Sequence, residues 1–155
     1  MKLLKFSDWL TEMKITAIPF KWNWVKWKEV SRSSQESGAA KAKFFSDLTD
    51  DDYEVFFSPY TEDSIIVEFN SRKLKSDLNA QSSPSVVSKI LSTVFSIMSD
   101  YLEKWPDKIL SFTGSDAKRS RVYKLFLDSN KSQFSDLHYR FDGEEIFIAS
   151  KSKEL

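Results

Sequence analysis

The sequence predicts an α+β fold, in which an antiparallel or mixed sheet of about five to seven strands packs against one long and one shorter amphipathic helix. Three features predict it. The first half of the chain alternates apolar and polar residues in short runs, as half-buried strands do. A long segment with a helical apolar stripe follows, and a second helical segment and a hairpin pattern come after it. The chain has 155 residues, and we expect one domain over residues 1–155.

The first half predicts one short helix and then four strands. Ser7 is a suitable N-cap for an amphipathic helix that Pro19 ends. Residues 20–30 alternate as a strand does, and the alternation shifts near Val25, which predicts a bulge or a bend. A polar loop and three further β-type runs follow, so we expect a four-stranded antiparallel meander with its later strands at residues 40–45, 53–57 and 64–69.

The long helix is the strongest local signal in the sequence. Pro84 stands at a favourable first helical position, and Pro106 ends the segment. Between them the apolar side chains fall in one broad stripe at the helical period, with Ser88 and Ser92 on the opposite side. This pattern predicts a core helix that packs on the sheet.

The last part of the chain predicts a strand, a second helix and a hairpin. Asp142 and Gly143 form a dipeptide that is typical of tight hairpin turns. The predicted elements are a strand at 108–112, a turn at 113–116, a helix at 117–130 and hairpin strands at 137–141 and 145–149.

Composition narrows the classes of function. Lys and Arg total 23, as do Asp and Glu, so a polycationic nucleic-acid coat and a polyanionic mimic both fit poorly. The absence of cysteine excludes disulfides and thiolate metal sites, and a single histidine, His138, excludes sites built from several histidines. We expect a cytoplasmic protein with no membrane span, no metal and no cofactor.

The charges are segregated along the chain. Residues 1–45 carry nine Lys/Arg and four Asp/Glu. Residues 46–70 carry eight Asp/Glu and no Lys/Arg, and residues 71–155 carry fourteen Lys/Arg and eleven Asp/Glu. The acidic block is interpreted first as a solvated turn and next as an acidic partner surface formed by Asp50, Asp51 and Asp52. A divalent-cation site, and with it a metal-dependent nuclease, is a weaker interpretation because adjacent carboxylates rarely converge on one ion.

The predicted helix at 117–130 carries a candidate anion site. At the helical period Arg119 falls inside the apolar stripe, so its guanidinium needs a carboxylate, carbonyls or a bound anion. It also lies in the first turn, where free backbone N–H groups favour phosphate or carboxylate. The alternative is a structural ion pair with a neighbouring strand. The candidate ligand-binding residues are Gly114, Ser115, Lys118, Arg119, Arg121 and Tyr123.

The same region carries a resemblance to a known group of sequences. Residues 109–127 resemble uncharacterised small proteins of phages and bacteria, in which a strand ending Phe-x-Gly-Ser precedes a helix carrying Arg-x-Arg-aliphatic-Tyr. Here these positions are Phe112, Gly114, Ser115, Arg119, Arg121, Val122 and Tyr123. The resemblance implies a phage or mobile-element origin and an accessory or counter-defence role. It implies no enzymatic activity in particular.

The tryptophan-rich segment allows two interpretations. Interleaved aromatic and basic residues stack bases and follow phosphates in single-strand binders, which makes a candidate surface of Trp22, Trp24, Lys26, Trp27 and Lys28. The alternative, which strand alternation alone favours, is that the aromatic side chains pack beneath the long helix.

These patterns favour binding over catalysis. The sequence has no G-x-S-x-G elbow, phosphate loop or dinucleotide fingerprint, and nothing ties His138 to a nucleophile. We therefore expect a non-catalytic protein-interaction module whose partner is another protein. The alternative is a protein that binds nucleic acid or nucleotides through the basic helix start and the tryptophan strand.

Overall fold

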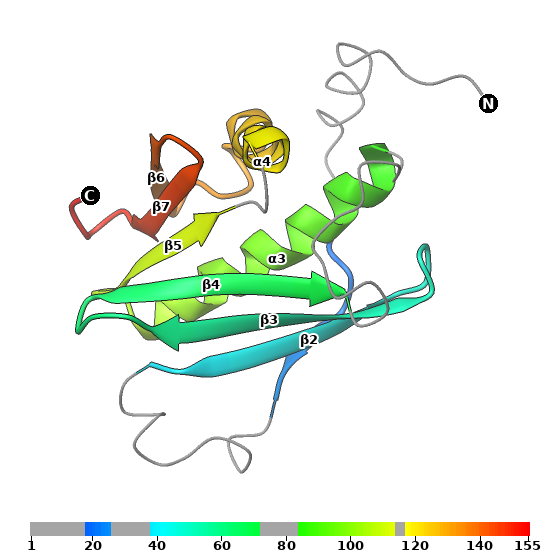
Figure 1. Ribbon diagram of the computed structural model, residues 1–155, viewed down its shortest axis with the longest axis horizontal. Helices are drawn as coiled ribbons and strands as arrows, with labels where there is room; N and C mark the ends of the chain where they lie inside the picture. The colour runs from blue at the N-terminus through cyan, green and yellow to red at the C-terminus, as the bar shows by residue number, and fades with distance from the viewer. Residues whose placement is uncertain (1–17, 26–37, 72–83, 114–116) are drawn as a thin grey trace.

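The computed structural model describes residues 18–25, 38–71, 84–113 and 117–155, which form one seven-stranded sheet and two helices (Figure 1). The strands are β1 Trp22–Trp24, β2 Ala40–Ser46, β3 Asp51–Pro59, β4 Ser64–Ser71, β5 Ile109–Thr113, β6 Leu137–Asp142 and β7 Glu145–Ser150. The helices are α3 Pro84–Lys104 and α4 Ala117–Ser129. The predicted α+β class is confirmed, while the helix predicted from Ser7 lies outside the described residues.

The sheet is mixed, in the order β1-β2-β3-β4-β5-β7-β6. The first four strands form the predicted antiparallel meander, and β5 pairs parallel to β4. A parallel neighbour requires a crossover connection, and α3 lies in the chain between these two strands. The hairpin of β6 and β7 then adds antiparallel strands beyond β5.

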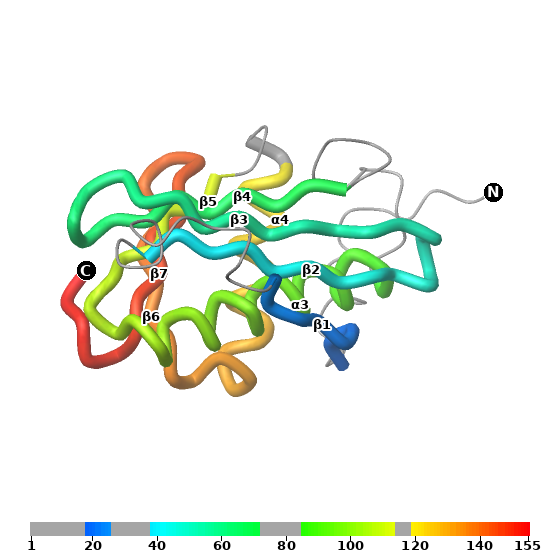
Figure 2. The backbone as a smooth tube through the Cα atoms, turned by 90° about the horizontal axis from the view of Figure 1, so that it is seen from below, coloured from blue at the N-terminus to red at the C-terminus, as the bar shows by residue number. Residues whose placement is uncertain are grey.

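One face of the sheet carries the core. Figures 1 and 2 show α3 lying along this face. Alternate residues of the strands point toward it and are buried, among them Val55, Val67 and Phe112. The predicted apolar stripe of α3 is confirmed, because Ile90, Val94 and their stripe neighbours Val87, Leu91, Phe95, Met98, Tyr101 and Leu102 are almost fully buried.

The polar side of α3 is more buried than predicted. Ser88 is 2% exposed and Ser92 is fully buried, although both were expected opposite the core. At Ser92 the reason is that the segment after α4 covers this side of the helix: Gln133 Nε2 donates to Ser92 Oγ at 2.9 Å, and the Phe134 ring lies 6.1 Å from that of Phe95. Small hydroxyl side chains allow this second layer to approach closely.

An aromatic stack fixes the end of α3 against the sheet. The Tyr101 ring stacks on Phe57 with centroids 4.3 Å apart, and Trp105 lies 4.6 Å away on Tyr101. The Tyr101 hydroxyl donates to the carbonyl of Gly38 at 2.6 Å. Burial, with a smaller contribution from the charge of Asp107, raises the pKa of Tyr101 well above its usual value. The phenol therefore stays protonated and keeps its hydrogen bond.

Gly38 is the residue that this stack depends on most closely. Its φ is +93°, and a Cβ there would lie 2.7 Å from the Tyr101 hydroxyl oxygen. We predict that Gly38→Ala destabilises the fold by about 2–4 kcal/mol, through backbone strain and displacement of the tyrosine. Gly143→Ala is the matched control, because its φ of +61° imposes strain but its Cβ meets nothing within 4 Å. Urea denaturation should show a loss of about 1 kcal/mol for the control, and equal losses would contradict the prediction.

Candidate functional site

The predicted helix at 117–130 forms as α4, but its candidate anion-binding residues do not share one surface. Tyr123 is 1% exposed and packs in the core, with its ring 4.9 Å from Phe112 and 6.2 Å from Phe69. Arg119 is half-buried and Arg121 is exposed. Gly114, Ser115 and the side chain of Lys118 lie outside the described residues. Tyr123 thus belongs to the core side of α4, where a ligand at the surface does not reach it.

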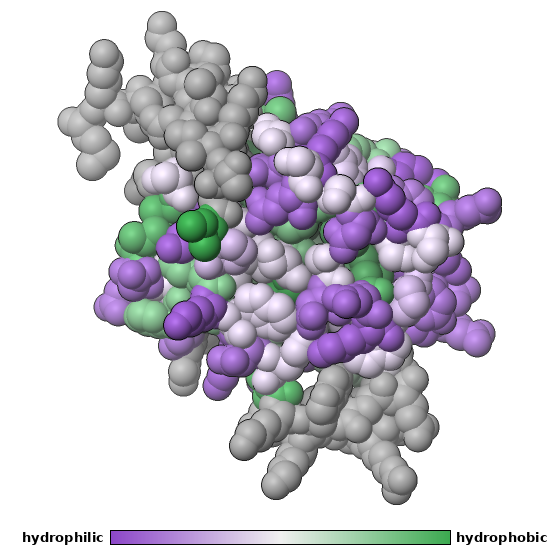
Figure 3. Space-filling view, turned by 180° about the vertical axis from the view of Figure 1, so that it is seen from behind, coloured by the Kyte–Doolittle hydropathy of each residue, from purple (hydrophilic) through white to green (hydrophobic). Residues whose placement is uncertain are grey.

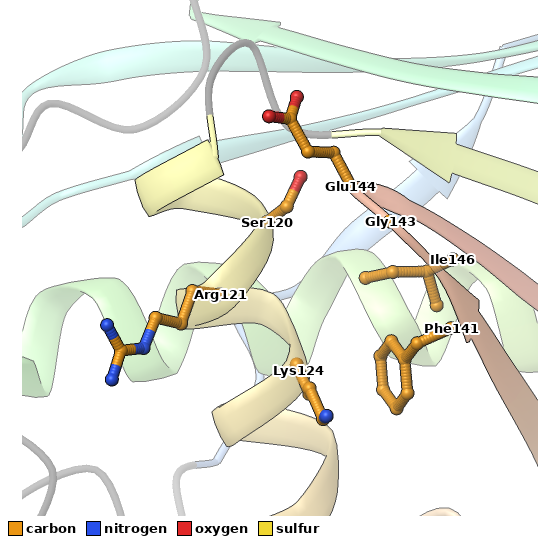
Figure 4. Close-up of a pocket in the computed structure, with 7 residues that line it drawn as sticks. All are labelled: Ser120, Arg121, Lys124, Phe141, Gly143, Glu144 and Ile146. Carbon is orange, nitrogen blue, oxygen red and sulfur yellow. The ribbon is translucent and has the colours of Figure 1, made fainter.

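A hollow of about 220 Å³ opens between α4 and the turn that joins β6 to β7 (Figure 4). Figure 4 shows Lys124 extending toward Phe141, while the guanidinium of Arg121 points away from them and the Glu144 carboxylate lies on the Ser120 side. The hollow is lined by Ser120, Arg121, Lys124, Phe141, Gly143, Glu144 and Ile146. The hollow therefore has Phe141 and Ile146 as its apolar part and carries charges of both signs, from Lys124 and Glu144.

Two contacts place α4 alongside the edge strand β6. Lys124 Nζ lies 4.9 Å from the centroid of the Phe141 ring, and Asp128 Oδ1 accepts a hydrogen bond from the Tyr139 hydroxyl at 3.2 Å. Because Lys124 precedes Asp128 on the helix while Phe141 follows Tyr139 on the strand, α4 runs antiparallel to β6. Burial, followed by the charge and hydrogen bond of Asp128, raises the pKa of Tyr139 to about 12.

The tryptophan strand is held against α3. Trp22 and Trp24 are half-buried, and the Trp24 indole N–H donates to Asp100 Oδ2 at 2.7 Å. Lys104 Nζ lies 3.4 Å from the same carboxylate and 5.1 Å from the centroid of the Trp24 ring. These contacts favour the packing interpretation for Trp24. The other members of the predicted nucleic-acid surface, Lys26, Trp27 and Lys28, lie outside the described residues.

The acidic block is a turn leading into a strand. Asp50 ends the turn with a φ of 49°, and Asp52 is exposed on β3. Asp51, predicted to lie on a solvated acidic surface, is only 5% exposed. Its Oδ2 accepts a short hydrogen bond from Ser71 Oγ, and its Oδ1 accepts from the backbone N–H of Asp52 at 2.8 Å. The alternation of β3 turns Asp51 inward, so an acidic surface here contains Asp50 and Asp52 without it.

The sheet face opposite α3 brings together residues that the sequence analysis did not connect. Among the described residues, no helix covers it (Figures 1 and 2). Figure 3 views the molecule from the α3 side, where the described surface is mostly hydrophilic. We use "open face" for the outward residues of the strands from β2 to β6, namely Lys41, Lys43, Phe45, Asp52, Glu54, Phe56, Ser58, Ile66, Glu68, Asn70, Ser111, Thr113, His138, Arg140, Asp142, Glu145 and Phe147.

Strand register arranges the open face in rows. One row pairs Lys43 with Glu54 and Glu54 with Asn70, and the next pairs Lys41 with Phe56 and Phe56 with Glu68. Glu54 and Glu68 are therefore diagonal neighbours near the centre of the sheet.

Apolar side chains on this face remain accessible beside the carboxylates. Phe45 is 50% exposed and Ile66 is 36% exposed. The open face as a whole carries five carboxylates and three cations, so it is acidic with apolar residues between the charges.

Comparison with known proteins identifies a family. Residues 49–143, well over half of the chain, match the model of a family of unknown function, DUF6934. The chain belongs to this family. No curated protein and no solved structure matches it.

The part of the chain that the DUF6934 model matches contains β3, β4, α3, β5, α4 and β6. It therefore includes the centre of the open face and the contacts between α4 and β6. Among the described residues, no group of three or more His, Asp or Glu side chains is placed to hold a metal ion. No helix in those residues is long and apolar enough to cross a membrane.

The contact between Tyr139 and Asp128 can be tested by titration. The folded state favours the neutral phenol of Tyr139. This preference contributes fully to the free energy of unfolding below a pH of about 10, and the contribution is lost as the pH rises toward 12. We predict that Asp128→Asn lowers the pKa of Tyr139 toward its usual value, as followed by phenolate absorbance with Tyr139→Phe to assign the signal. Asp142→Asn is the control and should leave the pKa of Tyr139 unchanged. An unchanged pKa in Asp128→Asn would refute the contact.

Proposed function

We propose that the chain is a non-catalytic protein-interaction module whose open face binds the basic surface of another protein. The observation that carries the proposal is the combination of exposed Phe45 and Ile66 with the carboxylates of Asp52, Glu54 and Glu68, on a sheet face that no helix of the described residues covers. Exposed apolar side chains beside charged ones can contribute buried area when a partner covers the face.

Charge complementarity supports a basic partner. The block at residues 46–70 contains no Lys or Arg, and three of its carboxylates, on Asp52, Glu54 and Glu68, lie on the open face. Such a field attracts a partner of opposite charge and raises its association rate. The apolar residues between the charges then contribute the burial that makes the complex persist.

The resemblance to small phage and bacterial proteins supports a host protein as the partner. It rests on Phe112, Gly114, Ser115, Arg119, Arg121, Val122 and Tyr123, within the part of the chain that the family model matches. An accessory or counter-defence role follows from that resemblance as part of the same proposal, with the host cytoplasm as the place of action.

The test is affinity capture from a host lysate with matched variants. Glu54→Lys combined with Glu68→Lys reverses the charge of the open face, and Glu103→Lys reverses an exposed carboxylate on α3. We predict that the wild type and the Glu103 variant retain the same protein, and that the open-face variant retains at least about tenfold less.

Salt and apolar truncation give two further readouts. Capture should weaken as salt rises from about 50 to about 500 mM, because the attraction is screened. Phe45→Ala and Ile66→Ala should weaken capture without lowering stability by more than about 1 kcal/mol, since both side chains are exposed. A captured partner that ignores both the charge reversal and the salt would contradict the proposal.

A further inference from the structure

Within the part of the chain that the structure describes, the edge strand β6 has backbone groups on its outer side that pair with no other strand. The hairpin closes with the pair Asp142 and Glu145 across the turn residues Gly143 and Glu144. In a two-residue hairpin this closing pair exchanges both backbone hydrogen bonds, and the pattern then alternates along the strands.

It follows that Tyr139 and Phe141 direct their N–H and C=O groups away from β7. Leu137 fits the same alternation, because its N–H bonds outward to the carbonyl of Phe134 at 3.1 Å. Within the described residues, no backbone hydrogen bond outside the β6–β7 ladder uses Tyr139 or Phe141.

Two charged residues of α4 lie beside this edge strand. Lys124 stands over Phe141 and Asp128 bonds to Tyr139, so a cation and an anion follow the strand in order. Four residues of helix rise about 6 Å and two residues of strand about 6.7 Å. Successive same-face residues of an added strand therefore match the spacing of Lys124 and Asp128. The hollow of Figure 4 lies at the Lys124 end.

We propose that β6 binds an extended peptide as an eighth strand, antiparallel to β6, with an acidic side chain beside Lys124 and a basic side chain two residues later beside Asp128. Main-chain pairing supplies affinity and the alternate side chains supply specificity, as in strand addition generally. This surface is separate from the open face, and it adds a second partner type to the proposed function.

A second copy of the chain is a poor occupant. If β6 paired antiparallel with β6 of a second copy, a two-fold axis at Tyr139 would bring the two Asp128 carboxylates together. A two-fold axis at Phe141 would bring the two Lys124 side chains together. An axis at Arg140 would place Lys124 beside Asp128 of the other copy, but on the opposite face it would bring two Arg140 guanidinium groups together. Like charges across neighbouring strands destabilise the pairing, so each self-paired register carries a repulsion that a partner of complementary sequence avoids.

The experiment uses two synthetic peptides of identical composition. One carries Glu-Val-Lys within a Ser/Thr background, and the other carries Lys-Val-Glu. We expect the full chain to bind the first about five- to tenfold more tightly by fluorescence polarisation, since two exposed charge pairs change from attractive to repulsive. Lys124→Glu combined with Asp128→Lys should reverse this preference, and Lys131→Glu, an exposed cation beyond α4, should leave it unchanged.

Backbone pairing has its own readout. N-methylation of the peptide at the Lys amide, which faces β6, should abolish binding, whereas N-methylation at the Val amide, which faces away, should change it less than about threefold. Circular dichroism establishes that the charge-reversed variant folds. Failure of both peptides to bind at about millimolar concentration, equal affinities, or a preference unchanged by charge reversal would each overturn the proposal. Because the open-face variants leave β6 intact, the two binding proposals fail independently.

Discussion

The packing of α3 on one face of a seven-stranded sheet is the constraint on which the rest of the structure depends. The helix is buried on two sides, by the strands and by the segment after α4, and it therefore cannot leave the sheet without exposing most of the core. Its end is fixed by the stack of Phe57, Tyr101 and Trp105. With the apolar surface concentrated on this side, the opposite face of the sheet is free to carry charge.

The second helix places two charged residues beside the edge strand at the other end of the sheet. Tyr123 and Phe126 anchor α4 in the core, and this anchoring sets the positions of Lys124 and Asp128 beside β6. The same helix therefore has a structural side and a side that faces the edge strand. Part of the predicted anion site falls on each side, which explains why Tyr123 and Arg121 do not act together.

Much of the fold could be predicted because its signals are local. The apolar period of α3, the alternation of the meander strands and the hairpin turn that follows Asp142 each depend on a few consecutive residues. The burial of Ser92 and Asp51 could not be predicted, because it depends on segments distant in sequence: Gln133 reaches Ser92, and Ser71 reaches Asp51. Hydroxyl and carboxyl groups look the same in a sequence whether they bond to water or to a buried partner.

The candidate surfaces were predicted less completely for a related reason. Alternation shows that Glu54 and Glu68 lie on the outer side of their strands, but only strand register shows that they are diagonal neighbours. The basic residues of α4 were identified from the helical period, whereas the proximity of Lys124 to Phe141 required the path of the final hairpin. Long-range pairing therefore decides both surfaces.

The division between a covered and an open face can be measured directly because the chain contains no cysteine. Adjacent residues of β4, Ile66 at 36% exposed and Val67 at 2% exposed, point to opposite faces. A cysteine introduced by Ile66→Cys should react with a thiol reagent at close to the rate of an unfolded peptide, while one introduced by Val67→Cys should react only as fast as the protein opens. Equal protection at both positions would mean that the outer face is covered, and would contradict the account of the protein given above.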